Sequence, residues 1–302
     1  MPRLNAPETG ECKICASPAV FIGTKAGTFK KDTEFTIFRC TNCAFAFVGN
    51  PWLEFDRIYS EAYYNGRGAD PSVDYVFELE SPNDTVRKYE WQGIFAAIQS
   101  HLKLTRETRW LDFGCGNGGL VRYCREHAGC AIFGYEEGWI RDQAERSGAP
   151  ILTSEELNGL SGSFDVVTAI EVLEHVPEPL LELRKMRSLL KPGGLLFFTT
   201  GNAAPFRDRL LDWPYVLPEV HISFYEPGTL DLALRQAGFK PEFAGFVPGF
   251  EDIIRFKVLK NLGIRKASVA ERLLPWSFLS RLIDSQRHVT ALPIGWASYE
   301  TV

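Results

Sequence analysis

The sequence lacks long apolar segments and a basic leader. No run of about 18 consecutive apolar residues, the length that a membrane-spanning helix requires, occurs in the chain. The first thirty residues contain no positively charged segment followed by an apolar one, as a secretory signal peptide would. Together these absences predict a soluble, cytoplasmic protein.

An excess of positive charge is also missing. The 302 residues include 33 Lys and Arg against 38 Asp and Glu, a formal net charge of −5. Because proteins that bind nucleic acid generally carry a basic surface, nucleic acid is not expected as a partner. The hydrophobic fraction of 45% is enough for one full α/β core, and the length leaves room for a small extra module.

The seven cysteines do not fit a set of disulfides, because their number is odd and no signal peptide precedes them. Four of them form two Cys-x-x-Cys pairs, and residues 19–38 between the pairs have the pattern of a β-hairpin. A redox Cys-x-x-Cys is the alternative, but that motif comes singly at a helix start. We therefore predict a zinc ribbon over residues 1–50, in which Zn²⁺ supports folding and not catalysis. Its ligands are expected to be Cys12, Cys15, Cys40 and Cys43.

A glycine-rich turn lies at the centre of the chain. Residues 110–113 form an apolar strand that runs into Gly114, Gly116 and Gly119, after which a helix is expected. Glycine allows the backbone to approach a ligand closely, and the helix start adds unpaired N–H groups. Glu136, twenty residues beyond Gly116, ends a second strand, where its carboxylate could accept hydrogen bonds from a ribose diol. This combination predicts a pocket for a nucleoside.

Two classes of cofactor satisfy the glycine pattern. The same spacing is the dinucleotide fingerprint, so an NAD(P)-dependent oxidoreductase is one interpretation. Asp112 favours another, because its charge would repel a pyrophosphate and attract an α-ammonium group. Downstream, residues 164–176 form a further strand followed by an acidic turn with Ile170 and Glu171, and residues 190–194 precede a fifth strand.

With these motifs, residues 83–247 strongly resemble the class I S-adenosylmethionine-dependent methyltransferases. The resemblance implies which residues hold the cofactor. Asp112, Gly114 and Gly116 would bind its methionine end, Glu136 its ribose hydroxyls, and Ile170 and Glu171 would lie near the methionine moiety or the reacting centre. Residues 151–154 lack the acidic residue that many members place near the adenine amine, so the adenine contact is left unassigned.

The alternation of strands and helices predicts a doubly wound, mostly parallel α/β sheet of seven strands, with its ligand at the carboxyl ends of the strands. Ser81 is expected to cap a helix that runs to about Leu102. A sixth strand is predicted near Phe243 and a last one over residues 288–299. The S-adenosylmethionine-binding domain would span residues 81–302, with a helical insertion at 251–287.

The segment 51–80 is rich in aromatic residues and is interpreted as a linker. In the resembling methyltransferases, a Tyr-Tyr segment ahead of the core often folds over the cofactor. Tyr63 and Tyr64 are therefore candidate lid residues.

Residues 201–228 leave the fifth strand at the ligand end and should wall the acceptor pocket. Methyl transfer to a hydroxyl requires a base, and His221 in this segment is the expected one. His175 is the second candidate, although a structural role competes because Glu-His-Val recurs in the resembling family whatever the acceptor. Asp212 and Tyr225 are reserves.

The order of ribbon, Tyr-Tyr segment and core resembles methyltransferases of glycan, nucleotide-sugar and natural-product tailoring. The resemblance implies O-methylation, or less favourably C-methylation, of a small-molecule acceptor such as a sugar or glycan precursor. A non-catalytic scaffold that binds a partner through its ribbon is a further alternative. The basic, amphipathic segment 251–287 is interpreted as a lid or homodimer face, and its apolar residues 273–279 could also contact a membrane surface.

Overall fold

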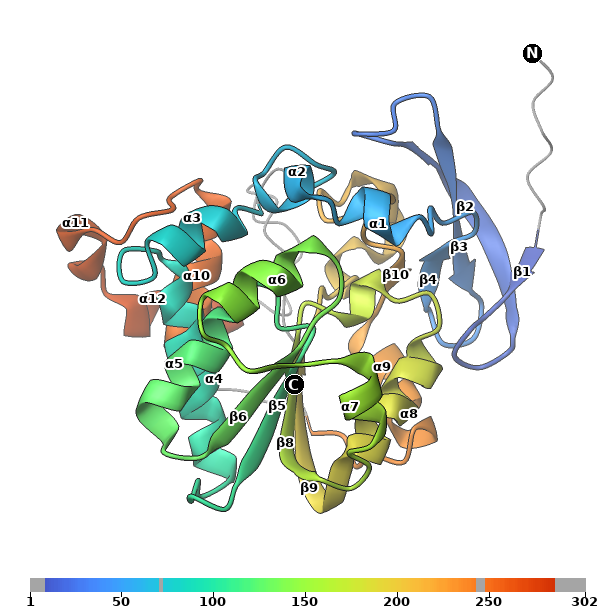
Figure 1. Cartoon of the computed structure of the whole chain (residues 1–302). Helices are drawn as coiled ribbons and strands as arrows, with labels where there is room; N and C mark the ends of the chain where they lie inside the picture. Colours follow the sequence, from blue (N-terminus) through green and yellow to red (C-terminus); the bar gives the residue numbers. More distant parts are fainter. Residues whose placement is uncertain (1–8, 71–72, 243–247, 286–302) are drawn as a thin grey trace.

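The computed structural model describes residues 9–70, 73–242 and 248–285, and this part of the chain contains two five-stranded sheets (Figure 1). One is a parallel sheet with helices on both faces, and the other is antiparallel and lies beside it. Within the described residues, no helix is long and apolar enough to cross a membrane.

The parallel sheet has the strand order β7-β6-β5-β8-β9. Its strands are β5 (Arg109–Phe113), β6 (Ala131–Tyr135), β7 (Ile151–Leu152), β8 (Phe164–Ile170) and β9 (Leu190–Thr199). The helices that follow them are α5 (Gly119–Ala128), α6 (Trp139–Arg146), α7 (Ser154–Asn158), the 3-10 helix η1 (Leu173–His175) with α8 (Pro179–Leu189), and α9 (Pro227–Gln236). The α/β Rossmann-like fold predicted from the alternation is confirmed.

Successive residues of the central strands pack on opposite faces of the sheet, as a strand with a period of two requires. Trp110 and Val166 join the cluster formed with α5 and with α4 (Arg87–His101). Leu111 and Val167 join the cluster formed with α8 and α9. Both faces are therefore covered, and the carboxyl ends of the strands are left for a ligand.

The prediction of seven strands is wrong for the described chain, which has five in this sheet. After β9, no further strand of the described residues joins the parallel sheet. The chain passes through η2 (Ala204–Asp212) to β10 (Ser223–Phe224), which pairs with the antiparallel sheet instead. The strands expected near Phe243 and over residues 288–299 lie outside the described residues.

The helix expected from Ser81 also begins elsewhere. A separate helix, α3 (Tyr75–Glu80), comes first, and Asp74 caps it by accepting a hydrogen bond from the Phe77 N–H over 3.1 Å. Ser81 ends this helix, and α4 begins only at Arg87, whose N–H donates to Thr85 Oγ1 over 3.1 Å. Asp74 and Thr85 are thus the side chains that accept backbone hydrogen bonds at the starts of the two helices.

The antiparallel sheet has the order β1-β2-β3-β4-β10. Its first four strands are β1 (Thr9–Glu11), β2 (Pro18–Ala26), β3 (Glu34–Cys40) and β4 (Ala46–Val48), so the predicted hairpin between the cysteine pairs is present. The fifth strand, β10, comes from the segment predicted to wall the acceptor pocket, and Ser223 lies opposite Phe47 of β4. This pairing joins the N-terminal sheet to that wall.

The described part of residues 251–287 is helical. It contains α10 (Phe250–Asn261), α11 (Val269–Arg272) and α12 (Trp276–Ser285), which lie beside α3 and α4 in Figure 1. Ile253 of α10 belongs to the same core cluster as α4, and Tyr89 of α4 donates a hydrogen bond to Glu271 of α11 over 2.6 Å. Helix α10 is therefore built into the domain. Two short helices, α1 (Phe55–Ile58) and α2 (Glu61–Tyr64), precede α3.

Candidate functional site

A cavity of about 340 Å³ lies at the carboxyl ends of β5, β6 and β8. Residues predicted to bind the cofactor line this cavity. Some come from the glycine turn and the end of β6, and others follow β8. They are Gly114, Gly116, Glu136, Ile170 and Glu171, with Tyr63 and Tyr64 from α2. Segments far apart in the sequence therefore enclose one space.

The glycine turn adopts backbone φ angles that would be strained for residues other than glycine. Gly114 and Gly116 have φ angles of +71° and +53°. A Cβ atom at Gly116 would lie 2.7 Å from the Tyr75 ring. The N–H groups of Gly114 and Cys115 both donate to the carbonyl of Tyr135, over 2.8 and 3.0 Å, which ties the turn to the end of β6.

Glu136 lies where a ribose would meet the turn. Its Oε2 accepts the Gly116 N–H over 2.6 Å and its Oε1 accepts the Glu137 N–H over 2.9 Å. Each carboxylate oxygen can accept a further hydrogen bond, so the geometry is compatible with a diol in the cavity. Burial raises the pKa of Glu136 to about 7.

Asp112 is 3% exposed and lies on a smaller cavity of about 50 Å³ that also touches Gly114. Its Oδ1 accepts a hydrogen bond from Thr168 Oγ1 over 2.7 Å. Burial, with the charges of Glu136 and Glu90, nevertheless raises the pKa of Asp112 to about 7. An α-ammonium group beside Asp112 would favour its charged form.

Arg87 lies on the same small cavity and was not among the residues predicted from the sequence. It is 8% exposed and forms ion pairs with Glu78 over 2.9 Å and Glu90 over 2.7 Å. Only the spacing of Arg87 and Glu90 on one helix could have indicated a pair. A guanidinium held in this way next to Asp112 fits a carboxylate on the same ligand.

The two tyrosines predicted as a lid are buried against the cavity, at 5% exposure for Tyr63 and 4% for Tyr64. Their rings meet edge to face, with centroids 5.1 Å apart, and Tyr64 stacks on Trp139 at the start of α6. Tyr59, one turn earlier, places its hydroxyl 3.0 Å from His175 Nδ1. The aromatic segment thus covers the glycine turn and the second candidate histidine.

His175 and His221 lie side by side, with ring centroids 4.8 Å apart. His175 Nδ1 is 2.9 Å from the Val220 carbonyl, and His221 Nδ1 is 2.6 Å from the Tyr215 carbonyl. Because a carbonyl oxygen only accepts, both Nδ1 atoms carry the proton, and the basic lone pair of each ring is on Nε2. His175 lines the cavity, whereas His221 is 5% exposed and is not one of the residues that line it.

Burial keeps both histidines neutral. It lowers the pKa of His221 below its ordinary value, and burial together with the neighbouring His221 lowers the pKa of His175 to about 3. A neutral imidazole can accept a proton from a hydroxyl, but the lowered pKa makes each ring a weaker base than a free imidazole.

A buried acidic network lies beside the histidines. Tyr215 donates to Glu174 over 2.5 Å and lies 3.2 Å from Glu171, and its ring stacks on His221. Burial alone would raise the pKa of Glu171, but Lys257 of α10, 2.9 Å away, and Lys260 lower it below its ordinary value. Burial and the charge of Glu171 raise the pKa of Glu174 to about 8. One carboxyl of the pair therefore carries the charge and the other the proton near neutral pH.

Glu174, His175 and His221 place potential ligand atoms within 4.8 Å of one another. However, the two oxygens of Glu174 already accept from Tyr215 and Thr200, and the Nδ1 atoms of both histidines donate to carbonyl groups. We interpret the group as a hydrogen-bonded network and not as a metal site.

The two reserve residues lie apart from this network. Asp212 is exposed and close to Lys25. Tyr225 is 1% exposed, donates to the Leu173 carbonyl over 2.9 Å and packs on Phe45. Both therefore have surface or packing roles in this structure.

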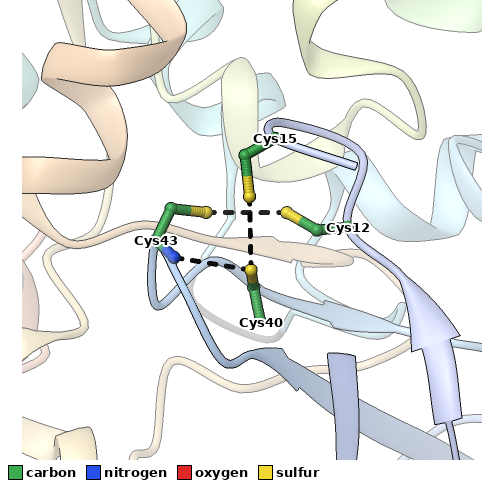
Figure 2. A group of neighbouring side chains, drawn as sticks. All are labelled: Cys12, Cys15, Cys40 and Cys43. Carbon is green, nitrogen blue, oxygen red and sulfur yellow. Dashed lines mark hydrogen bonds between the residues drawn. The ribbon is translucent and has the colours of Figure 1, made fainter. Parts of the chain in front are cut away.

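The four predicted ligand cysteines converge at the end of the antiparallel sheet. Figure 2 shows the side chains of both Cys-x-x-Cys pairs pointing toward a common centre, and all four Sγ atoms lie within 4.8 Å of one another. The Sγ atoms of Cys12 and Cys43 are 3.5 Å apart and those of Cys15 and Cys40 are 3.4 Å apart. A tetrahedron with zinc–sulfur bonds of about 2.3 Å has edges of about 3.8 Å, so the cluster fits Zn²⁺.

The local backbone supports ligation by thiolates. The N–H groups of Ile14, Asn42 and Cys43 lie 3.3 to 3.4 Å from Sγ atoms of the cluster. The hydrogen bond with Cys43 lowers the pKa of Cys12 to about 5. N–H donors of this kind favour the charged form of the sulfur, which is the form that binds a metal.

The cysteine cluster is linked directly to the rest of the site. Thr229 at the start of α9 donates to the Cys43 carbonyl over 2.5 Å, and Lys13 Nζ donates to the Pro177 carbonyl over 2.8 Å. Pro177 lies on the cavity, two residues after His175. The cluster therefore anchors segments that also shape the acceptor side.

The comparisons with known proteins agree with this geometry. A family model described as a methyltransferase domain matches residues 85–242, just over half of the chain. The ubiquinone biosynthesis O-methyltransferase of Bordetella pertussis is 34% identical over 161 residues, which cover 44% of this chain and 62% of the relative. The protein of the same name from Ruegeria pomeroyi is 40% identical over 157 residues, covering 46% and 63%. The chain thus spans about three fifths of the length of these curated relatives.

Among solved structures, the phosphoethanolamine N-methyltransferase 2 of Haemonchus contortus is similar with a TM-score of 0.51 at 17% identity, covering 70% of this chain and 51% of that one. This likeness concerns the fold alone. On the family match, the chain belongs to the methyltransferase-domain family. The nicotinamide alternative that the glycine spacing left open is thereby set aside.

Proposed function

We propose that this protein transfers a methyl group from S-adenosylmethionine to an oxygen, less favourably a carbon, of a small metabolite. A sugar or glycan precursor is the proposed acceptor. The observation that carries the proposal is the single cavity on which the glycine turn, Glu136 and the residues after β8 meet. His175 lies on that cavity, and His221 packs against His175 without lining it.

Separate residues of the chain bind separate parts of the cofactor. Asp112 offers a carboxylate to the α-ammonium group, Arg87 a guanidinium to the carboxylate, and Glu136 its oxygens to the ribose hydroxyls. Bound in this way, the cofactor supplies a sulfonium methyl group as the electrophile. Tyr63 and Tyr64 exclude water from the cavity, so positioning contributes much of the rate.

His221 is the proposed general base. With Nδ1 donating to the Tyr215 carbonyl, the lone pair of the ring is on Nε2, and burial favours the neutral form. The acceptor hydroxyl would pass its proton to Nε2 as its oxygen forms the bond to the methyl carbon and the sulfonium sulfur recovers the electron pair.

Support for an oxygen acceptor comes from the relatives, which are named O-methyltransferases. Support for a sugar comes from the order of motifs in the sequence. Trp213 is 1% exposed and packs between Phe206 and Tyr215, so its ring adds no support for a sugar.

The test has two parts. Calorimetric titration with S-adenosylhomocysteine should show tight binding that is lost in Asp112→Ala. Methyl transfer from radiolabelled S-adenosylmethionine should then be screened over sugars, sugar phosphates, nucleotide sugars and phenols. Transfer to sugars that disappears in His221→Gln supports the proposal. Turnover of phenols alone would refute the sugar acceptor, and cofactor binding without turnover of any acceptor would favour the scaffold alternative.

A further inference from the structure

A third cavity, of about 300 Å³, lies between α3, α4 and α10 and shares Glu78 and Arg87 with the small cavity on which Asp112 lies. The basic helix α10 was singled out by its charge in the sequence, yet the methyltransferase mechanism uses none of that charge. Polar side chains from all three helices and the following loop line the cavity. They include Asp74, Glu78, Arg87, Lys260, Asn261 and Arg265.

Most of the charges on this wall already have partners. Arg87 is paired with Glu78 and Glu90, and Arg265 with Asp74. Lys260 differs, because no hydrogen bond or ion pair of its Nζ is found within residues 9–70, 73–242 and 248–285.

The position of Lys260 makes its charge costly. It is half-buried on the last turn of α10, and burial, followed by the charge of Arg87, lowers its pKa below the ordinary value. A buried cation without an ion-pair partner is unfavourable, and an anion brought into the cavity would offset that cost.

Lys260 also lies within electrostatic reach of the proposed reacting centre. Its charge lowers the pKa of both His221 and Glu171. Glu171 is hydrogen-bonded to Lys257, three residues earlier on α10, so the two lysines face the same side of the molecule.

We propose that the cavity at Lys260 is a binding site for an anionic group, a carboxylate or a phosphate, carried by a small metabolite. The inference goes beyond the proposed function, because this cavity shares no lining residue with the one on which Gly116 and Glu136 lie. The carboxylate of the cofactor is a competing anion, but the small cavity beside Asp112 already offers it Arg87.

The test follows the reactivity of Lys260 in the full-length protein saturated with S-adenosylhomocysteine. The lysines are acetylated with a water-soluble succinimidyl acetate, and the rate at each site is measured by peptide mapping, with exposed Lys103 as the internal reference. Inorganic phosphate and malonate are added in separate arms, and sodium chloride at equal ionic strength serves as the control.

Phosphate or malonate should slow acetylation of Lys260 at least about tenfold relative to chloride and leave Lys103 unchanged. The anion that protects at the lower concentration identifies the group as phosphate or carboxylate. Titration of the anion into Lys260→Met should show at least about tenfold weaker binding, whereas Lys103→Met should behave as the parent protein.

Equal rates with phosphate, malonate and chloride would overturn the inference. So would a Lys260→Met variant that binds S-adenosylhomocysteine about tenfold more weakly, because Lys260 would then serve the cofactor. Failure of the proposed function would look different: the parent protein would not bind S-adenosylhomocysteine at all.

Discussion

Gly116 donates its backbone N–H to Glu136 Oε2 over 2.6 Å, so a glycine of the turn and the acid at the end of the next strand are held together before any ligand binds. Glu136 keeps its position through this bond and through the Glu137 N–H. The acid is preorganised for a diol, and its removal should affect binding more than folding.

We expect Glu136→Gln to weaken S-adenosylhomocysteine binding by about ten- to a hundredfold, because it replaces charged acceptors with a neutral amide. Calorimetric titration measures the change, and thermal unfolding should move little. Glu137→Gln, a substitution at the more exposed neighbour, is the matched control. Parent-like affinity in Glu136→Gln would contradict the assignment of the ribose contact.

Cofactor affinity should depend on pH through Asp112 and Glu136. Burial raises the pKa of each carboxyl to about 7 in the free protein, so both are largely protonated in mild acid. A ligand with an α-ammonium group needs Asp112 charged, and binding must then expel a proton. Affinity should fall by up to about tenfold per pH unit below about pH 7 for each coupled group.

The measurement is the S-adenosylhomocysteine dissociation constant between about pH 6 and about pH 8. Asp112→Asn should bind weakly at every pH and show a shallower dependence than the parent protein. A parent profile that is flat across this range would show that Asp112 does not contact the ammonium group.

His221→Gln should lower kcat by about 10²–10⁴ for an oxygen acceptor and leave the affinity for S-adenosylhomocysteine unchanged, because the base acts on the acceptor alone. The lowered pKa of His221 predicts that activity persists in acid to below the ordinary titration of histidine. His101→Gln, at an exposed position on α4, is the control. A full kcat in His221→Gln would transfer the role to His175.

The sequence was most informative where the structure is local. The strand from Trp110, the glycine turn and the two cysteine pairs each depend on residues close together in the chain, and each is present. The position of Glu136 followed because a strand of known length connects it to the turn. The start of α4 was mispredicted because Thr85, and not Ser81, accepts at its first turn.

The acceptor side was less predictable because its contacts are long-range. Tyr215 comes from an irregular segment with no period, yet it lies against Glu171 and Glu174. Lys257 is 86 residues from Glu171, and nothing in the pattern of α10 marks which of its lysines faces inward. Such residues emerge only when β8 and α10 are packed together.

Exposed apolar side chains gather on α11, α12 and the loop between them. Leu273 is 81% exposed and Phe278 is 64% exposed, and basic Arg272 and Arg281 flank them. This composition favours an anionic bilayer surface. We expect the protein to float with vesicles that contain anionic lipid, and the Leu273→Ser, Phe278→Ser double variant to remain in solution. If the parent protein sediments as a dimer and the double variant sediments as a monomer, the patch is instead a homodimer face.

Metal removal should impair the acceptor side more than the cofactor side. We expect about one equivalent of zinc per chain, since four thiolates saturate a tetrahedral site. Chelation would release the ends of the ribbon, and with them the bond from Thr229 to the Cys43 carbonyl and the pairing of β4 with β10. His221 lies two residues before β10, whereas Asp112 and Glu136 lie on the parallel sheet.

The zinc-free protein should therefore unfold at a lower temperature. Each kcal/mol lost from the free energy of unfolding should lower Tm by about 2–4 °C. Turnover should be lost, whereas binding of S-adenosylhomocysteine should remain. Cys43→Ser should reproduce this behaviour and Cys130→Ser, away from the cluster, should not. Readdition of Zn²⁺ should restore turnover in the chelated parent but not in Cys43→Ser. Full turnover and an unchanged Tm without zinc would mean that packing around Phe45 and Tyr225 alone holds the acceptor wall in place.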